Sequence, residues 1–235
     1  GTARPASIPA SVKGWNAIAS LANMPPDFAV VMDNFIPRPG YLEVRRGSQS
    51  FASGCGTATT PVQTVMGYNA PNTANSKLFA AANTTIYDIT AGATASATSI
   101  TSLSTSRLQY ENFTNSSLTS YLIAANGVDA ALIYNGTAWS ALSVTGIKTS
   151  KIIQPKVWKG RLWFCLVNST QVAYLPVGAI AGTAATFDLG PLMSRGGFVN
   201  AIATWTVDTK QSVDEYIAFI SSQGQVFVYQ GTDPS

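Results

Sequence analysis

Short apolar runs separated by polar turns recur along the chain from residue 61 onward. Each recurrence has an opening strand, a variable polar loop, an apolar strand, a tight turn and a final strand of apolar and aromatic residues. The apolar strands align on four anchor residues, Leu78, Leu122, Leu162 and Ile217, which lie 44, 40 and 55 residues apart. Repeats of about 40–50 residues that carry three or four short strands are typical of β-propeller blades. The pattern therefore predicts an all-β fold with about four β-propeller-like repeats of short antiparallel strands.

The predicted strands fall at similar places in each repeat. They cover residues 62–68, 77–82 and 86–89, then 108–113, 121–125 and 131–134, then 152–158, 161–167 and 172–175, and finally 201–205, 215–220 and 226–229. Asn126-Gly127 lies between two apolar runs, which predicts a type I′ hairpin turn because both central residues of that turn need a positive φ. Four repeats form either an incomplete propeller or a small closed one. A pair of β-sandwiches is the alternative, since sandwich strands recur in a similar way, about every 8–12 residues.

The first 50 residues follow a different pattern. Apolar side chains at Trp15, Ile18, Leu21 and Met24 are three residues apart, which predicts one or two turns of helix. A further short helical turn is expected to begin at Pro25-Pro26 and to run through Val31. We expect this segment to lie as an arm over another surface rather than to form a core.

A β-hairpin is predicted over residues 32–47. An apolar pair precedes the sequence Pro-Arg-Pro-Gly at 37–40, in which proline fixes φ and the glycine can take a positive φ. The second strand ends on the basic pair Arg45-Arg46, and neighbours on a strand point to opposite faces. The predicted domains are therefore an N-terminal arm and hairpin for docking, residues 1–50, and the blade-like repeats, residues 51–235.

The 235-residue chain is poor in charge. Charged residues make up 11% of it, less than half of the ~25% that is typical of soluble domains. Its apolar content of 46% disfavours disorder. In a folded chain, so low a charge suits a protein that hides surface in an assembly or works outside the cytoplasm. The net charge of +3 is mild and the basic residues are scattered apart from Arg45-Arg46, which does not by itself favour nucleic-acid binding. No apolar run reaches about 18 residues, so no membrane span is predicted.

The sequence lacks the residue types that many enzymes use. It contains no histidine, which removes the commonest general base and the commonest metal ligand. Cys55 and Cys165 lie far apart without a CxxC motif, so a zinc site is not expected, and the spacing leaves open whether they form a disulfide. No phosphate-binding or dinucleotide-binding fingerprint occurs, and the acidic residues lie in no motif that marks a catalytic pair. We therefore expect no enzymatic activity, no cofactor and no metal.

The N-terminal region also carries a set of short motifs. They are Gly14-Trp15-Asn16, Leu21, Met24-Pro25, Ala29, Asp33-Asn34-Phe35, Pro37-Arg38-Pro39-Gly40 and Glu43-Val44-Arg45-Arg46-Gly47. Together they resemble the N-terminal region of tail proteins of tailed bacteriophages, and within that group the nozzle (tail tubular protein B-like) β-propellers of short-tailed phages. The segment 228–234 is similar to one that those proteins carry within a longer propeller. The match covers about residues 13–47 and 226–235, and the middle of the chain matches only in its blade-like rhythm.

The resemblance implies a structural protein of the virion, located in the phage tail. Such proteins form a ring, commonly a hexamer, around the channel through which DNA leaves, beneath the portal and adaptor. The implied partners are copies of the chain itself, the portal, adaptor or other tail proteins and, transiently, genomic DNA. We expect the assembly interface to include the following residues: Trp15, Asn16, Asp33, Phe35, Arg38, Arg45 and Arg46.

Two other functions fit the same repeats. One is a carbohydrate-binding, carbohydrate-cleaving or receptor-binding β-propeller module, which an aromatic-rich cleft flanked by two acids would favour. The other is a secreted bacterial surface protein, which a genomic context without portal or terminase genes would favour.

Overall fold

The structure is a computed structural model that describes residues 7–57, 59–208 and 213–231. In it the chain divides into two compact units, Gly1–Ser50 and Phe51–Ser235. The first unit contains one β-hairpin and the second contains all the other strands. The fold is all-β, as the sequence predicts, and the described residues include no α-helix.

The hairpin of the first unit joins β1 (Phe35–Arg38) to β2 (Tyr41–Val44) in antiparallel register. This confirms the predicted hairpin but shortens its turn, because Pro37 and Arg38 belong to the first strand. The turn consists of Pro39 and Gly40 alone, and Gly40 has a φ of +82°. A proline followed by a glycine at positive φ is the residue pair that a type II turn requires.

The helical turns predicted before the hairpin are wrong. Residues 15–24 form bends and turns instead, and Trp15 makes an isolated parallel bridge to Ala29. The Asn16 side chain explains the difference, because its Oδ1 accepts hydrogen bonds from the backbone N–H groups of Ile18 and Ala19, both at 3.0 Å. Asparagine that bonds its own backbone in this way offers the chain an alternative to the helix.

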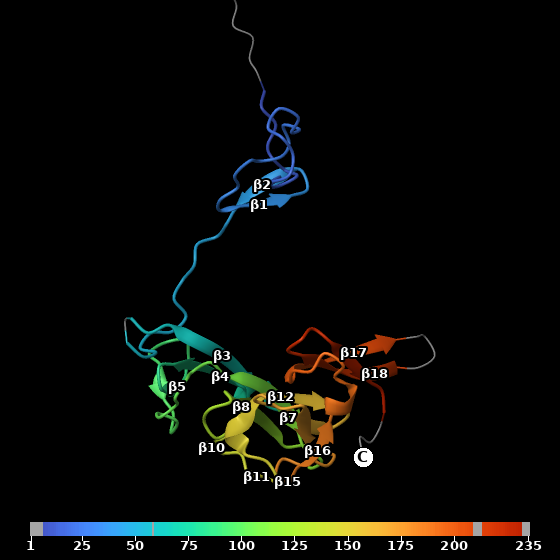
Figure 1. The fold of residues 1–235 in the computed structure, drawn as a ribbon. Helices are drawn as coiled ribbons and strands as arrows, with labels where there is room; N and C mark the ends of the chain where they lie inside the picture. Colours follow the sequence, from blue (N-terminus) through green and yellow to red (C-terminus); the bar gives the residue numbers. More distant parts are fainter. Residues whose placement is uncertain (1–6, 58, 209–212, 232–235) are drawn as a thin grey trace, which may run out of the picture. The chain divides into compact units, whose positions relative to one another are not determined.

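The second unit consists mainly of four consecutive antiparallel sheets, each built from one continuous stretch of chain (Figure 1). Sheet I contains β3 (Val62–Tyr68), β4 (Lys77–Ala82), β5 (Thr85–Asp88) and β6 (Ser96–Ala97). Sheet II contains β7 (Gln109–Thr114), β8 (Ser120–Ala125), β9 (Leu132–Tyr134) and β10 (Trp139–Ala141). Sheet III contains β12 (Ile152–Trp158), β13 (Arg161–Leu166), β14 (Gln171–Tyr174) and β16 (Ala185–Asp188). Sheet IV contains β17 (Val199–Asp208), β18 (Val213–Ser221) and β19 (Val226–Tyr229).

The remaining elements lie in the connections. β11 (Val144–Thr145) and β15 (Gly182–Thr183) pair in parallel. Three short 3₁₀ turns complete the described elements: η1 (Thr73–Asn75), η2 (Thr149–Lys151) and η3 (Gly190–Leu192). No described helix is long and apolar enough to cross a membrane.

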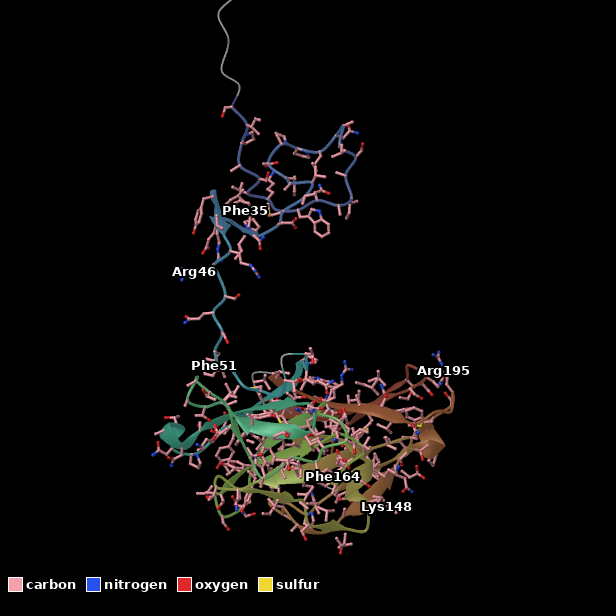
Figure 2. The ribbon with its side chains drawn as sticks, turned by 90° about the vertical axis from the view of Figure 1, so that its left-hand side faces the viewer. Phe35, Arg46, Phe51, Lys148, Phe164 and Arg195 are labelled. Atoms are coloured by element: carbon pink, nitrogen blue, oxygen red, sulfur yellow. The ribbon has the colours of Figure 1, made fainter. Side chains whose placement is uncertain are left out.

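The sheets pack against one another in chain order through three hydrophobic clusters. One cluster joins sheets I and II, the next joins II and III, and the last joins III and IV. Strand β13 contributes to two of them, because Phe164 faces sheet II while the adjacent Trp163 faces sheet IV. Both side chains are fully buried, and Figure 2 shows Phe164 inside this unit, with the exposed Lys148 and Arg195 at its surface. The consecutive meanders give the propeller-like arrangement that the repeats predict.

The predicted type I′ turn at Asn126-Gly127 is wrong. Gly127 has a φ of +76°, but Asn126 is not at positive φ, and the loop runs on to Leu132. The Asn126 side chain accepts hydrogen bonds from Val128 N and Asp129 N, which stabilises a longer loop. The type I′ dihedral pattern lies instead between β12 and β13, where Lys159 and Gly160 have φ values of +46° and +69°.

Candidate assembly surface

The first unit has no hydrophobic core among its described residues. Gly14 is the only buried position between residues 7 and 50, whereas the second unit contributes every described hydrophobic core residue. Ten large apolar side chains of the first unit are exposed: Ile8, Trp15, Ile18, Leu21, Val30, Val31, Phe35, Ile36, Tyr41 and Val44. The proportion of large apolar side chains left exposed in this unit makes it the candidate assembly surface of the chain.

Backbone and polar contacts, rather than apolar packing, hold the segment before the hairpin. Asn16 N donates to Ala29 O at 3.0 Å, and the Trp15 indole Nε1 donates to Val30 O at 2.9 Å. Lys13 Nζ lies 2.7 Å from Asp27 Oδ2. The hydrogen bond from Lys13 lowers the pKa of the Asp27 carboxyl below its ordinary value. The Trp15 ring is thereby fixed in direction while 68% of the residue stays exposed.

Two arginine side chains at the hairpin form ion pairs with the same carboxylate, that of Glu43. Arg38 Nε donates to Glu43 Oε2 across the two strands at 2.9 Å. Arg46 Nε lies 4.0 Å from the other oxygen of Glu43, and its side chain is 93% exposed. Such exposed pairs contribute about 0–1 kcal/mol to stability, so this network orients the arginines more than it stabilises the hairpin.

The structure places all seven predicted interface residues in the first unit. Trp15 and Phe35 expose their rings, Arg38 is turned toward Glu43, and Asn16 forms the turn described above. Arg45 and Arg46 lie beyond the end of β2, so strand alternation does not decide which way they point. Eight exposed apolar residues of the first unit were not among those predicted: Ile8, Ile18, Leu21, Val30, Val31, Ile36, Tyr41 and Val44. Ile18 belongs to the apolar three-residue spacing of residues 15–24, and that spacing predicts a helix rather than an exposed surface.

The linings of two hollows in the second unit each include aromatic residues and one carboxylate. Trp158, Trp205 and Glu215 line the first, and Tyr134, Trp139 and Asp88 are among the residues that line the second. A glycosidase-type pair needs two carboxyl groups, and neither hollow has a second one among the described residues that line it. Asp88 is also engaged by its own chain. Burial raises its pKa, but hydrogen bonds from Thr90 and Lys77 outweigh that effect and the net pKa is lowered.

The described residues contain no group of three or more His, Cys, Asp or Glu side chains that could hold a metal ion. Cys55 and Cys165, whose pairing the sequence leaves open, are both free thiols. Cys165 is fully buried, its Sγ lies 3.5 Å from Val199 O, and burial raises its pKa to about 12. Cys55 is partly exposed, and burial raises its pKa as well.

We expect one thiol per chain to react with a disulfide reagent at pH 8 in the native state, because Cys55 is partly exposed whereas Cys165 is fully buried and out of reach of the reagent. The second thiol should react only after unfolding in guanidinium. Absorbance at the reagent's thiolate band measures both phases. In Cys55→Ser, the native reaction should disappear while the denatured reaction remains. Two fast native thiols, or none even after unfolding, would contradict this assignment.

Asp129 joins two loops of the second unit. Its carboxylate accepts hydrogen bonds from Ser104 N at 2.8 Å, Ser104 Oγ at 2.7 Å and Asn126 Nδ2 at 2.7 Å. Burial raises the pKa of this carboxyl, but these hydrogen bonds outweigh it and the net pKa is lowered. The interaction therefore ties the connection between sheets I and II to the loop between β8 and β9.

Asp129→Asn should lower the free energy of unfolding by about 1–2 kcal/mol at pH 7, since it replaces a charged acceptor with an amide. A carboxyl whose pKa is lowered in the folded state stabilises above its unfolded pKa of about 3.9, and this stabilisation is lost as the pH falls through the folded value. The difference between wild type and variant should therefore stay constant from pH 7 to about pH 5 and shrink as the pH falls further in urea titrations. Asp33→Asn, on an exposed carboxylate of the first unit, should change stability by less than about 0.5 kcal/mol. A difference that is constant with pH would show that Asp129 acts through shape alone.

Comparisons with known proteins add little to this geometry. No protein-family model matches the chain, and no curated protein matches it. Among solved structures, the computationally designed Ika4 protein matches 78% of this chain and 99% of its own length, with 16% sequence identity and a TM-score of 0.47. A match at this level shows neither a shared function nor a shared family.

Proposed function

We propose that the chain is a structural component of a bacteriophage virion, a nozzle-type tail protein. In this proposal copies of the chain form a ring, with six copies by the resemblance, around the DNA exit channel beneath the portal and adaptor. The observation that carries the proposal is the exposure of large apolar side chains in the first unit. Among its described residues this unit exposes ten large apolar side chains and buries none, and it contains the N-terminal motifs that resemble tail proteins.

The chemistry of the chain supports an architectural role. The hydrogen bond from the Trp15 indole to Val30 O sets the direction of this exposed ring before a partner binds. Pre-ordering of this kind reduces the entropy cost of docking. The low charge of the whole chain suits surfaces that are covered in an assembly. DNA contact in this proposal is transient and confined to the channel.

Cryo-electron microscopy of the particle that carries this chain tests the proposal. We expect density for the chain as a ring on the tail axis, with residues 7–50 covered by a neighbouring protein. Density confined to the capsid shell or to fibres would overturn it, and so would a cellular surface location without particles. Gold-labelled antibodies against the chain provide the matched control, because they should bind the tail end only.

A further inference from the structure

The outward face of sheet IV is apolar throughout its described part. In the strand register Ala203 lies opposite Ala218 and Trp205 opposite Tyr216, and Ala218 lies opposite Val228. Because strand side chains alternate, these residues share one face. That face comprises Ala201, Ala203, Trp205, Tyr216, Ala218, Ile220, Val226 and Val228. Trp205, Val226 and Val228 are 43%, 60% and 54% exposed, while Trp205 stacks on Tyr216 with ring centroids 5.3 Å apart.

The outward face of sheet I is apolar in the same way. Val65 lies opposite Ala80, which lies opposite Tyr87, so these three share a face that points away from sheet II. Val62 and Val65 are 45% and 50% exposed. Part of this face is already covered, since Ala80 and Ala82 are both buried. Val65 lies in the part that remains open.

The three internal contacts between sheets show what such faces do in this fold. Each sheet has a leading face, which packs on the sheet before it, and a trailing face, which packs on the sheet after it. In sheet II the leading face includes Leu122 and the trailing face includes Ile123. Sheet III repeats this with Phe164 and Trp163. By the same order, the open face of sheet I is a leading face and the open face of sheet IV is a trailing face.

We infer that the trailing face of sheet IV in one copy packs on the leading face of sheet I in a second copy. The inference deepens the proposed function, on whose self-assembly it rests, by naming the two contact surfaces. A second copy is the occupant because this chain itself carries both halves of a contact that it already makes three times internally. The two halves differ, so the contact is heterologous, and it generates a ring or an open chain of copies.

The residues named on the two faces are uncharged, and none needs a polar partner on its side chain except the Tyr87 and Tyr216 hydroxyls and the Trp205 indole. A lysine in place of an exposed valine on either face would therefore bury an unpaired ammonium in the contact. That cost corresponds to at least about a 100-fold weaker association. The same substitution on an exposed valine outside both faces should have no such effect.

The test uses the full chain with Val228→Lys on the trailing face, Val65→Lys on the leading face and Val128→Lys as the control. Val128 is 59% exposed in the loop between β8 and β9 and lies on neither face. Sedimentation velocity should show that the wild type and the control form oligomers, and that each face variant alone is a monomer. Thermal unfolding of each variant should stay close to that of the wild type, which separates lost contact from lost fold.

Mixing the two face variants gives the decisive result. Each retains one intact face, so an equimolar mixture should form a 1:1 dimer that grows no further. A wild type that stays monomeric, a mixture that stays monomeric, or a Val65→Lys variant that still forms oligomers would overturn the inference. These outcomes leave the location of the chain in the particle untouched, whereas a location away from the tail would overturn the proposed function even if the copies associate.

Discussion

Phe164→Ala is expected to lower the free energy of unfolding of the second unit by about 3–5 kcal/mol. Phe164 is fully buried between sheets II and III, and alanine leaves a cavity that the surrounding sheets can fill only in part. Small domains are stable by about 5–15 kcal/mol, so this single change removes a large share of the total. Urea titration followed by tryptophan fluorescence and far-ultraviolet circular dichroism measures it.

The position of Phe164 also makes the expected transition cooperative. Its strand, β13, supplies Phe164 to one inter-sheet cluster and Trp163 to the next, so loss of packing on one side loosens the other. We expect both optical probes to give one coincident transition at a lower urea concentration, with an unchanged slope. Phe35→Ala is the matched control, because Phe35 is 47% exposed and belongs to the first unit. A Phe164→Ala midpoint equal to that of the control would contradict the role of this cluster.

Much of the fold follows from the sequence because the long central strands are apolar on both faces. The bounds of the central strand β4 agree with the predicted run 77–82, and those of β8 and β13 differ from the predicted 121–125 and 161–167 by one residue at one end. The short outer strands could not be predicted in the same way. β6 contains only Ser96 and Ala97, and its pairing depends on the tertiary position of the neighbouring strand rather than on composition.

Turns were less predictable than strands, since one side-chain hydrogen bond can redirect them. Asn126 could have formed a type I′ turn, but its amide bonds Asp129 and Thr105 and extends the loop. The three-residue spacing from Trp15 to Met24 is compatible with a helix, yet Asn16 closes a local turn instead. In a segment without a core, apolar spacing carries no information about which face is buried, so the exposed Ile18 could not be recognised as part of a surface.

Removing residues 1–50 is expected to leave the second unit folded and to abolish its incorporation into the particle. All described core residues lie beyond residue 50, so the remaining chain keeps its three inter-sheet clusters and should unfold cooperatively. The lost segment carries ten of the exposed large apolar side chains, and a few buried anchors supply most of the binding energy in a protein interface. Incorporation, measured by quantitative blotting of purified particles, should fall by at least about 100-fold.

A full-length variant separates loss of the surface from loss of the segment. Ile18→Ser combined with Tyr41→Ser removes two apolar side chains that are 99% and 56% exposed, and neither side chain contributes to a described core. This variant should lose incorporation while its unfolding transition stays unchanged, whereas Leu118→Ser, on a 78% exposed side chain of the second unit, should incorporate normally. If the truncated chain fails to unfold cooperatively, the first unit stabilises the fold of the second unit rather than binding a partner protein. If the truncated chain enters particles at the wild-type level, assembly depends on the sheets alone, and the exposed rings of the first unit have another partner.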